Sequence, residues 1–108
     1  MPVYALNLFD LAGNDLYKQY SRRSADAVAK YGGRVVALGK LREGAPHLGE
    51  SPRQAMILVE WPSMEAFDGF LNDSEHEDLH PLREGGTQNY LWWLYDSLDD
   101  LRPLFAGR

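Results

Sequence analysis

The sequence contains no cysteine, no excess of positive charge and no long apolar run, and each absence excludes a class of protein. Without cysteine among its 108 residues, the chain forms no disulfide, holds no thiolate-bound metal and performs no thiol catalysis. Its 16 acidic and 11 basic side chains give a net charge of −5, which argues against binding to nucleic acid or to an anionic membrane. No basic and apolar leader follows Met1, so we predict a cytoplasmic protein with no membrane partner.

Several motifs of well-known chemistry are also missing. The chain has no glycine-rich phosphate loop, no G-x-S-x-G and no C-x-x-C. The RNA recognition module shares the order of elements inferred below, but it needs a basic, aromatic third strand, and residues 54–61 (QAMILVEW) carry no positive charge. We therefore predict no nucleic-acid partner and no cofactor.

The composition that remains is that of a globular domain. Hydrophobic residues make up 44% of the chain and charged residues 25%, which is enough to build one core. We predict a single domain over residues 1–108, with a C-terminal tail from about residue 97.

Four short segments rich in β-branched and aromatic residues predict strands, and two segments with apolar residues at helical spacing predict helices. Gly32 and Gly33 end the first helix, Ser63 caps the second, and Pro81 interrupts a further helical piece over residues 74–84. The predicted strands are residues 3–9, 34–41, 54–61 and 88–95, and the main helices follow residues 15 and 63.

The resulting order is β-α-β-β-α-β, which predicts an α+β protein with a ferredoxin-like antiparallel sheet. Right-handed crossovers place both main helices on the same face of that sheet. A twelve-residue loop, 42–53, joins the second and third strands.

Both faces of the predicted sheet are apolar. In the last strand, Tyr90, Trp92 and Leu94 alternate with Leu91, Trp93 and Tyr95, so neither face carries the polar residues expected next to water. Two helices cover one face only. We therefore predict a homodimer that pairs through the second face, with the alternative that the C-terminal tail folds back over it.

Two runs and a set of later residues carry a family resemblance. The runs are K-Y-G-G-R over residues 30–34 and E-W-P-S-M-E-A over residues 60–66, and the later residues are Asn72, Glu75, Leu79, Leu82 and Arg83. With them, the chain resembles the domain of unknown function family 1330 of the dimeric α/β-barrel superfamily, over roughly residues 4–95. The resemblance implies ferredoxin-like subunits that pair sheet to sheet.

The same resemblance leaves the reaction open. The superfamily includes cofactor-free monooxygenases, haem-degrading enzymes, lactone isomerases and ligand-sensing modules, so the fold does not decide the chemistry. This chain has Asp73, Ser74, Glu75 and His76 where the family pattern usually reads Ser-Pro-Glu-Tyr, and Leu38 where an arginine is frequent.

Three residues are candidates for catalysis. Arg83 offers a planar fork to a carboxylate or an enolate, or else forms a salt bridge with Glu60, Glu84 or Asp73. Asn7 lies in an apolar strand, where a buried amide needs a partner or a ligand. His76 is the third candidate, and it lies four residues before His80.

The histidine spacing could also place two metal ligands on one side of a helix. Pro81 disfavours helical geometry at His80, so a solvated acidic helix is the preferred interpretation and we predict no metal.

Trp61 and Trp93 belong to an aromatic group that could line a slot for a flat ligand, although core packing is the commoner role of such residues. The predicted ligand-binding residues are Asn7, Trp61, His76, Arg83 and Trp93. We predict that the homodimer binds a small, partly apolar molecule. The alternatives are a cofactor-independent monooxygenase or isomerase of aromatic or enolisable substrates, and a non-catalytic interaction module.

Overall fold

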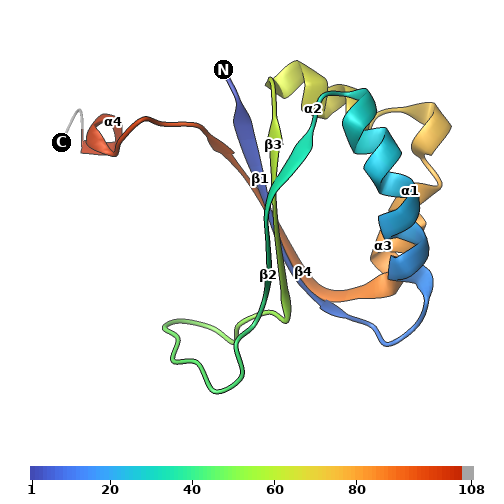
Figure 1. The fold of residues 1–108 in the computed structure, drawn as a ribbon, viewed down its shortest axis with the longest axis horizontal. Helices are drawn as coiled ribbons and strands as arrows, with labels where there is room; N and C mark the ends of the chain where they lie inside the picture. Colours follow the sequence, from blue (N-terminus) through green and yellow to red (C-terminus); the bar gives the residue numbers. More distant parts are fainter. Residues whose placement is uncertain (106–108) are drawn as a thin grey trace.

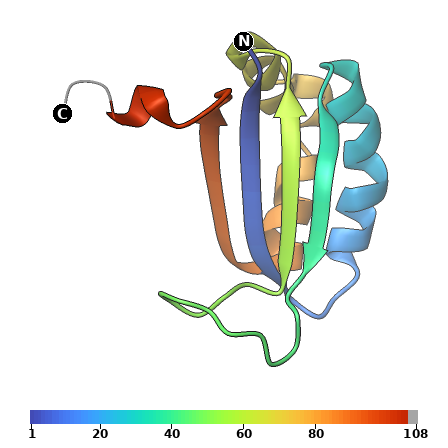
Figure 2. The same ribbon diagram turned by 60° about the vertical axis from the view of Figure 1, so that its left-hand side comes forward.

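Four antiparallel strands form one sheet (Figure 1), and Figure 2 shows their order, β2-β3-β1-β4. The structure is a computed structural model and describes residues 1–105. β1 and β4 are the longest strands and pair along almost their whole length. At the end near Ala12, β1 is two residues longer than predicted and β4 is one residue longer. The strands are β1 (Val3–Leu11), β2 (Arg34–Lys40), β3 (Ala55–Trp61) and β4 (Thr87–Asp96).

The helices all lie against one face of this sheet, as Figures 1 and 2 show. This confirms the predicted α+β class and the order of strands and main helices. The helical elements are α1 (Leu16–Lys30), α2 (Met64–Leu71), the short 3-10 helix η1 (Ser74–His76), α3 (Leu79–Gly86) and α4 (Arg102–Phe105).

The helix boundaries follow local hydrogen bonds. Ser63 caps α2 as predicted, because its Oγ accepts a hydrogen bond from the Ala66 amide at 3.1 Å. At the start of α1, Asn14 Oδ1 accepts from the Leu16 amide. The predicted interruption at Pro81 was misplaced: Pro81 is the third residue of α3, where no helical amide bond is lost, and the break precedes Leu79.

The core lies between the sheet and the helices. Trp61 is 2% exposed and packs against the rings of Phe67 and Phe70 at centroid distances of 5.6 and 4.9 Å. The other buried members of this cluster are Val3, Ala5, Ala27, Val59 and Leu79. Aromatic residues therefore dominate the packing that fixes α2 on the sheet.

No helix of residues 1–105 packs on the second face of the sheet. Leu6, Leu58 and Trp93 lie on it, and Trp93 is 47% exposed. Loop 41–54 and the C-terminal tail both extend on the side away from the helices (Figures 1 and 2). We call this side the open face. Its apolar residues are Tyr4, Leu6, Leu8, Met56, Leu58, Leu91, Trp93 and Tyr95.

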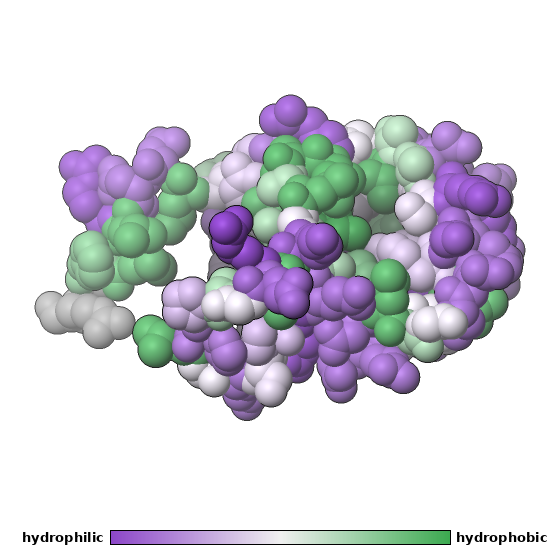
Figure 3. Space-filling model, turned by 60° about the horizontal axis from the view of Figure 1, so that its bottom comes forward, coloured by the Kyte–Doolittle hydropathy of each residue, from purple (hydrophilic) through white to green (hydrophobic). Residues whose placement is uncertain are grey.

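The tail leaves the sheet after β4 and does not fold back onto it. The Ser97 amide donates to the Pro2 carbonyl, and beyond that point the chain extends away from the strands (Figure 2). Hydrophobic residues gather on the tail in Figure 3, and Leu101 and Phe105 are 59% and 63% exposed. The part of the tail that the structure describes thus does not cover the open face, and residues 106–108 of the predicted tail lie outside the described residues.

The far end of loop 41–54 is fastened to the sheet at an irregular point of β4. Asn89 adopts a left-handed conformation, with φ 55°, beside the register shift in the β1–β4 ladder. Its Nδ2 donates to Asp10 and its carbonyl accepts from Arg53 Nε at 2.7 Å.

Among residues 1–105, no helix is long and apolar enough to cross a membrane.

Candidate functional site

A cavity of about 320 Å³ lies between α1 and the sheet. Its size falls at the lower end of the range of small-molecule sites. α1 contributes side chains at helical spacing, which is why residues three and four positions apart face the same space. The side chains that line it come from α1 (Tyr17, Tyr20, Ser21, Ser24, Ala25 and Val28) and from the sheet with its flanking turn (Asn7, Gly33, Arg34, Val35, Leu38, Ile57, Val59 and Tyr90).

The inner side of β2 leaves this cavity accessible. Val35 and Leu38 point toward the helix layer, opposite Val59 and Ile57 of β3, yet they are 51% and 71% exposed. The helices do not extend far enough to cover the β2 edge of the sheet. The cavity therefore has an apolar opening at this edge.

The polar groups of the cavity are organised around Asn7. Its Nδ2 donates to the carbonyls of Ala5 and Ile57, both at 3.2 Å, and its Oδ1 accepts from the Tyr90 hydroxyl at 2.5 Å. The half-buried amide thus finds its partners within the protein. The Tyr90 ring stacks on Phe9 at 5.1 Å, which fixes the ring as well as the hydroxyl.

Three tyrosines keep their protons at neutral pH. Burial raises the pKa of Tyr17, Tyr20 and Tyr90, and the nearby charge of Arg83 opposes this rise only in part. The Tyr17 and Tyr20 rings lie 5.4 Å apart. The cavity therefore holds neutral phenols and no tyrosinate.

A crevice of about 40 Å³ continues from the cavity toward the core, and Asn7, Tyr20, Val28 and Val59 line both spaces. The crevice is otherwise bounded by Ala5, Trp61, Phe67, Phe70, Arg83 and Trp92.

Arg83 and Trp61 bring hydrogen-bond donors to this crevice. Arg83 lies over the rings of Tyr90 and Trp92, with its guanidinium carbon 5.6 and 5.4 Å from the ring centroids. None of the ion pairs among residues 1–105 includes it. The buried Nε1 of Trp61 likewise has no hydrogen-bond partner in the part of the chain that the structure describes.

The acidic partners expected for Arg83 are used elsewhere. Glu60 accepts from Arg34 Nε at 3.1 Å, and Asp73 pairs with Lys30 Nζ at 3.0 Å. The salt-bridge alternative for Arg83 is not observed with Glu60, Glu84 or Asp73. Its guanidinium lies beside the Tyr20 hydroxyl and over two aromatic rings.

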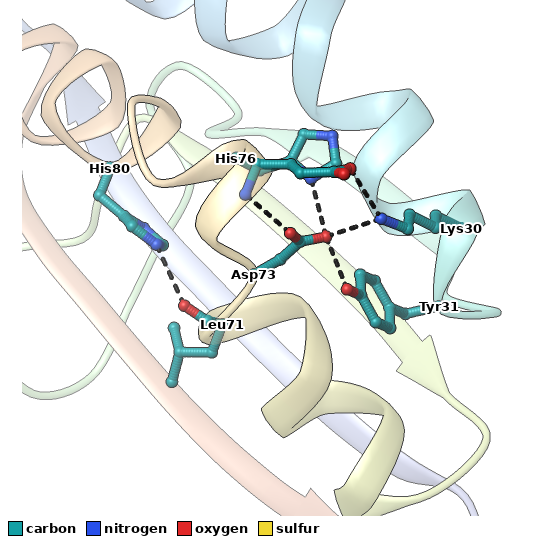
Figure 4. Close-up of polar contacts among 7 residues, drawn as sticks. Lys30, Tyr31, Leu71, Asp73, His76 and His80 are labelled. Atoms are coloured by element: carbon teal, nitrogen blue, oxygen red, sulfur yellow. Dashed lines mark hydrogen bonds and ion pairs between the residues drawn. The ribbon is translucent and has the colours of Figure 1, made fainter.

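A second polar cluster joins the C-terminal end of α1 to the segment after α2, and Figure 4 shows it. Asp73 is its centre, with a side chain 6% exposed. Its Oδ2 accepts from Lys30 Nζ at 3.0 Å, from the Tyr31 hydroxyl at 2.6 Å and from His76 Nδ1 at 3.0 Å. These bonds, with that from Tyr31 first, hold the pKa of Asp73 below its ordinary value.

This Asp73 cluster accounts for His76. The imidazole does not line the cavity or the crevice. His80 points elsewhere and places Nε2 3.2 Å from the Leu71 carbonyl, so that nitrogen is a donor (Figure 4). No group of three or more potential metal ligands occurs among the described residues.

The structure brings three of the five predicted ligand-binding residues together. Asn7, Trp61 and Arg83 meet at the crevice, whereas His76 lies in the Asp73 cluster and Trp93 lies on the open face. Their role in binding stays a prediction. The sequence analysis missed Tyr17 and Tyr20, although their spacing with Ser24 and Val28 along one helix face was the signal that could have found them.

A family model described as "Domain of unknown function (DUF1330)" matches residues 2–94, which is most of the chain. The chain belongs to this family. The match includes β1 to the last part of β4, and therefore every residue of the cavity and the crevice. A comparison with curated proteins found no match.

Solved structures similar to this family member share its fold. A protein of unknown function from Rhodopseudomonas palustris is 20% identical, with a TM-score of 0.81 over 92% of this chain and 84% of that one. SnoaB from Streptomyces nogalater, a cofactor-independent oxygenase, is 18% identical, with a TM-score of 0.65 over 93% and 96%. A dimeric ferredoxin-like protein of unknown function from Jannaschia is 14% identical, with a TM-score of 0.63 over 90% and 100%. The predicted family and ferredoxin-like fold are confirmed.

Proposed function

We propose that this protein binds a small, partly apolar molecule in the cavity between α1 and the sheet. The observation that carries the proposal is the cavity itself, with a volume of about 320 Å³ and walls in which apolar side chains surround a few fixed hydroxyl groups. A filled core would instead favour a pure interaction module. A cytoplasmic location is part of the proposal and rests on the sequence alone.

The catalytic alternative ranks second for a chemical reason. The similarity to SnoaB concerns the fold, and the free guanidinium of Arg83 could stabilise an enolate. A proton abstraction, however, needs a base that is unprotonated near neutral pH. The described cavity lining contains no histidine and no carboxylate, and burial raises the pKa of its tyrosines. We therefore rank ligand binding without catalysis above the catalytic alternative.

The test is native mass spectrometry of freshly purified protein, followed by a thermal-shift screen of phenols, quinols and short acids. We expect a retained small molecule or a stabilising compound, since a ligand that binds the folded state raises its melting temperature. Ser24→Phe, which fills the cavity, should remove the shift. Gln19→Phe on the exposed side of α1 should keep it. A flat response to every compound contradicts the proposal.

We further propose that two copies pair through the open face. The chain exposes 7681 Å², whereas a compact monomer of its 12.3 kDa mass exposes roughly 6,100 Å². Its radius of gyration is 15.4 Å, against about 13 Å for a compact domain of this length. The excess surface supports an assembly in which the open face is covered.

The two projecting segments add to the area available for such pairing. Two flat sheet faces alone would remove only about 760 Å² from water, less than a stable interface needs. Loop 41–54, with Leu48 fully exposed, and the apolar tail extend on the same side and can supply the rest.

Sedimentation equilibrium at micromolar concentration tests this pairing. We expect twice the monomer mass for the wild type and a monomer for Leu6→Glu, which places a charge in the middle of the open face. Gln19→Glu is the control for added charge. A folded wild-type monomer across this range contradicts the proposed dimer.

A further inference from the structure

The donors of Trp61 and Arg83 at the crevice indicate the chemistry of one end of the ligand. The Trp61 side chain is 2% exposed and its N–H has no acceptor among residues 1–105. Arg83 borders the same crevice and has no ion-pair partner in that part of the chain. Buried donors in native proteins are normally paired, so the unpaired N–H of Trp61, at the same small space as a half-buried guanidinium without an ion-pair partner, indicates an acceptor that comes from outside the chain.

The charges around the site point the same way. The lining of the cavity and of the crevice contains no aspartate and no glutamate, although the whole chain has a net charge of −5. Of the two arginines in this lining, Arg34 is paired with Glu60 and Arg83 is not. Glu84 borders only the outer hollow beside Arg83. The border of the crevice therefore contains one arginine without an ion-pair partner among the described residues.

We propose that the crevice binds the carboxylate of a small apolar acid, with the acid's apolar body in the 320 Å³ cavity. A carboxylate accepts hydrogen bonds and donates none, and its flat shape matches the guanidinium fork of Arg83 and the single N–H of Trp61. A crevice of about 40 Å³ has room for such a head group. This inference rests on the proposed function, because it names the chemical class of the molecule that the cavity holds.

A single water molecule is the competing occupant. The crevice is large enough for one, and a water could accept from Trp61 and from Arg83. Water would satisfy both donors without any preference for an anionic ligand. The two occupants are distinguished by a matched pair of probes.

Benzoate and benzamide form this pair, since they have nearly the same shape but differ in charge and in hydrogen-bond donors. We expect benzoate to bind at least about tenfold more tightly than benzamide in a titration followed by ¹H–¹⁵N NMR. The three tryptophans give three indole signals, and Trp61→Phe identifies the one that belongs to Trp61. Benzoate should shift this signal downfield, because the N–H gains an acceptor.

Substitutions at Arg83 localise the effect. Arg83→Gln should weaken benzoate about tenfold and leave benzamide unchanged, and Arg83→Lys, which keeps the charge but not the fork, should fall between. Arg22→Gln on the exposed surface of α1 is the matched control and should bind like the wild type. Circular dichroism verifies that each variant is folded.

Each outcome decides a different claim. Equal binding of benzoate and benzamide, or benzoate binding that Arg83→Gln does not weaken, overturns the carboxylate assignment and leaves the proposed function intact. Failure of both probes and of every compound in the thermal-shift screen overturns the proposed function and this inference together.

Discussion

Two polar clusters at the helix layer, the Asp73 cluster and the crevice, have opposite properties. Around Asp73 every strong donor has an acceptor, and Lys30, Tyr31 and His76 converge on one carboxylate. At the crevice, the Trp61 N–H has no acceptor and Arg83 has no ion-pair partner among the described residues. A complete cluster stabilises the fold, whereas an incomplete one is free to interact with a ligand. The distinction is measurable, because stability and binding should respond to different substitutions.

Asp73→Ala should have the largest effect on stability. The substitution removes the acceptor of three side-chain donors and of the Glu75 amide, and hydrogen bonds to a charged group contribute more to stability than neutral ones. We expect the largest fall in the thermal midpoint of any variant discussed, with benzoate affinity unchanged. Glu75→Ala is the control, because Glu75 also pairs with Lys30 but is 75% exposed. Equal effects of the two substitutions would refute a structural role for Asp73.

The pH dependence of stability should reveal the same carboxylate. Its pKa in the folded state lies below the ordinary value of 3.8, so its contribution is complete above that value and is lost as the pH falls below it. In urea denaturation, the stability difference between the wild type and Asp73→Asn should be constant from about pH 5 to 7 and shrink toward pH 3. A difference that persists unchanged at pH 3 contradicts the depressed pKa.

Substitutions at two neighbouring glycines test how close packing against α1 positions α3, and therefore Arg83. A Cβ at Gly86 would lie 2.5 Å from the Tyr17 backbone nitrogen, whereas one at Gly85 would meet only the flexible end of Leu16 at 2.8 Å. Gly86→Ala should lower the free energy of unfolding by about 1–3 kcal/mol, and Gly85→Ala should change it by less than about 1 kcal/mol. Similar values for the two variants in chemical denaturation would show that close packing does not set this contact.

Arg83→Gln should have the smallest effect on stability. The side chain forms no ion pair with the described residues, and its contacts with the Tyr90 and Trp92 rings are weak. We expect the free energy of unfolding to change by less than about 1 kcal/mol. A loss of unfolding free energy as large as that of Asp73→Ala would mean that Arg83 belongs to a structural cluster. The contrast between the Asp73 cluster and the crevice would then fail.

The sequence was sufficient to predict the fold because its signals are local. Alternation along the strands, the Ser63 cap and the glycines after the first helix each depend on neighbouring residues. The apolar character of both sheet faces was also readable, since it follows from strand periodicity. The boundary at Pro81 failed because proline is tolerated in a first helical turn, and sequence alone did not show where that turn begins.

The candidate site was predictable only in part, because it depends on contacts between distant elements. Asn7, Trp61 and Arg83 meet through the sheet ladder and the packing of α3, which no local pattern encodes. Trp61 and Trp93 were predicted to belong to one aromatic group, yet they lie on opposite faces of the sheet. His76 was predicted to bind the ligand, but its imidazole bonds to Asp73, which in turn pairs with Lys30 of the distant α1. Only the folded chain shows these contacts.

The amide of Asn7 fixes the direction of one hydroxyl hydrogen. Both of its own hydrogens are donated to strand carbonyls, so its oxygen receives the proton of Tyr90. Tyr90 is then left with lone pairs toward the cavity. Among the three hydroxybenzoates, the isomer whose ring hydroxyl reaches these lone pairs should be preferred over its two regioisomers, and methylation of that hydroxyl should abolish the preference.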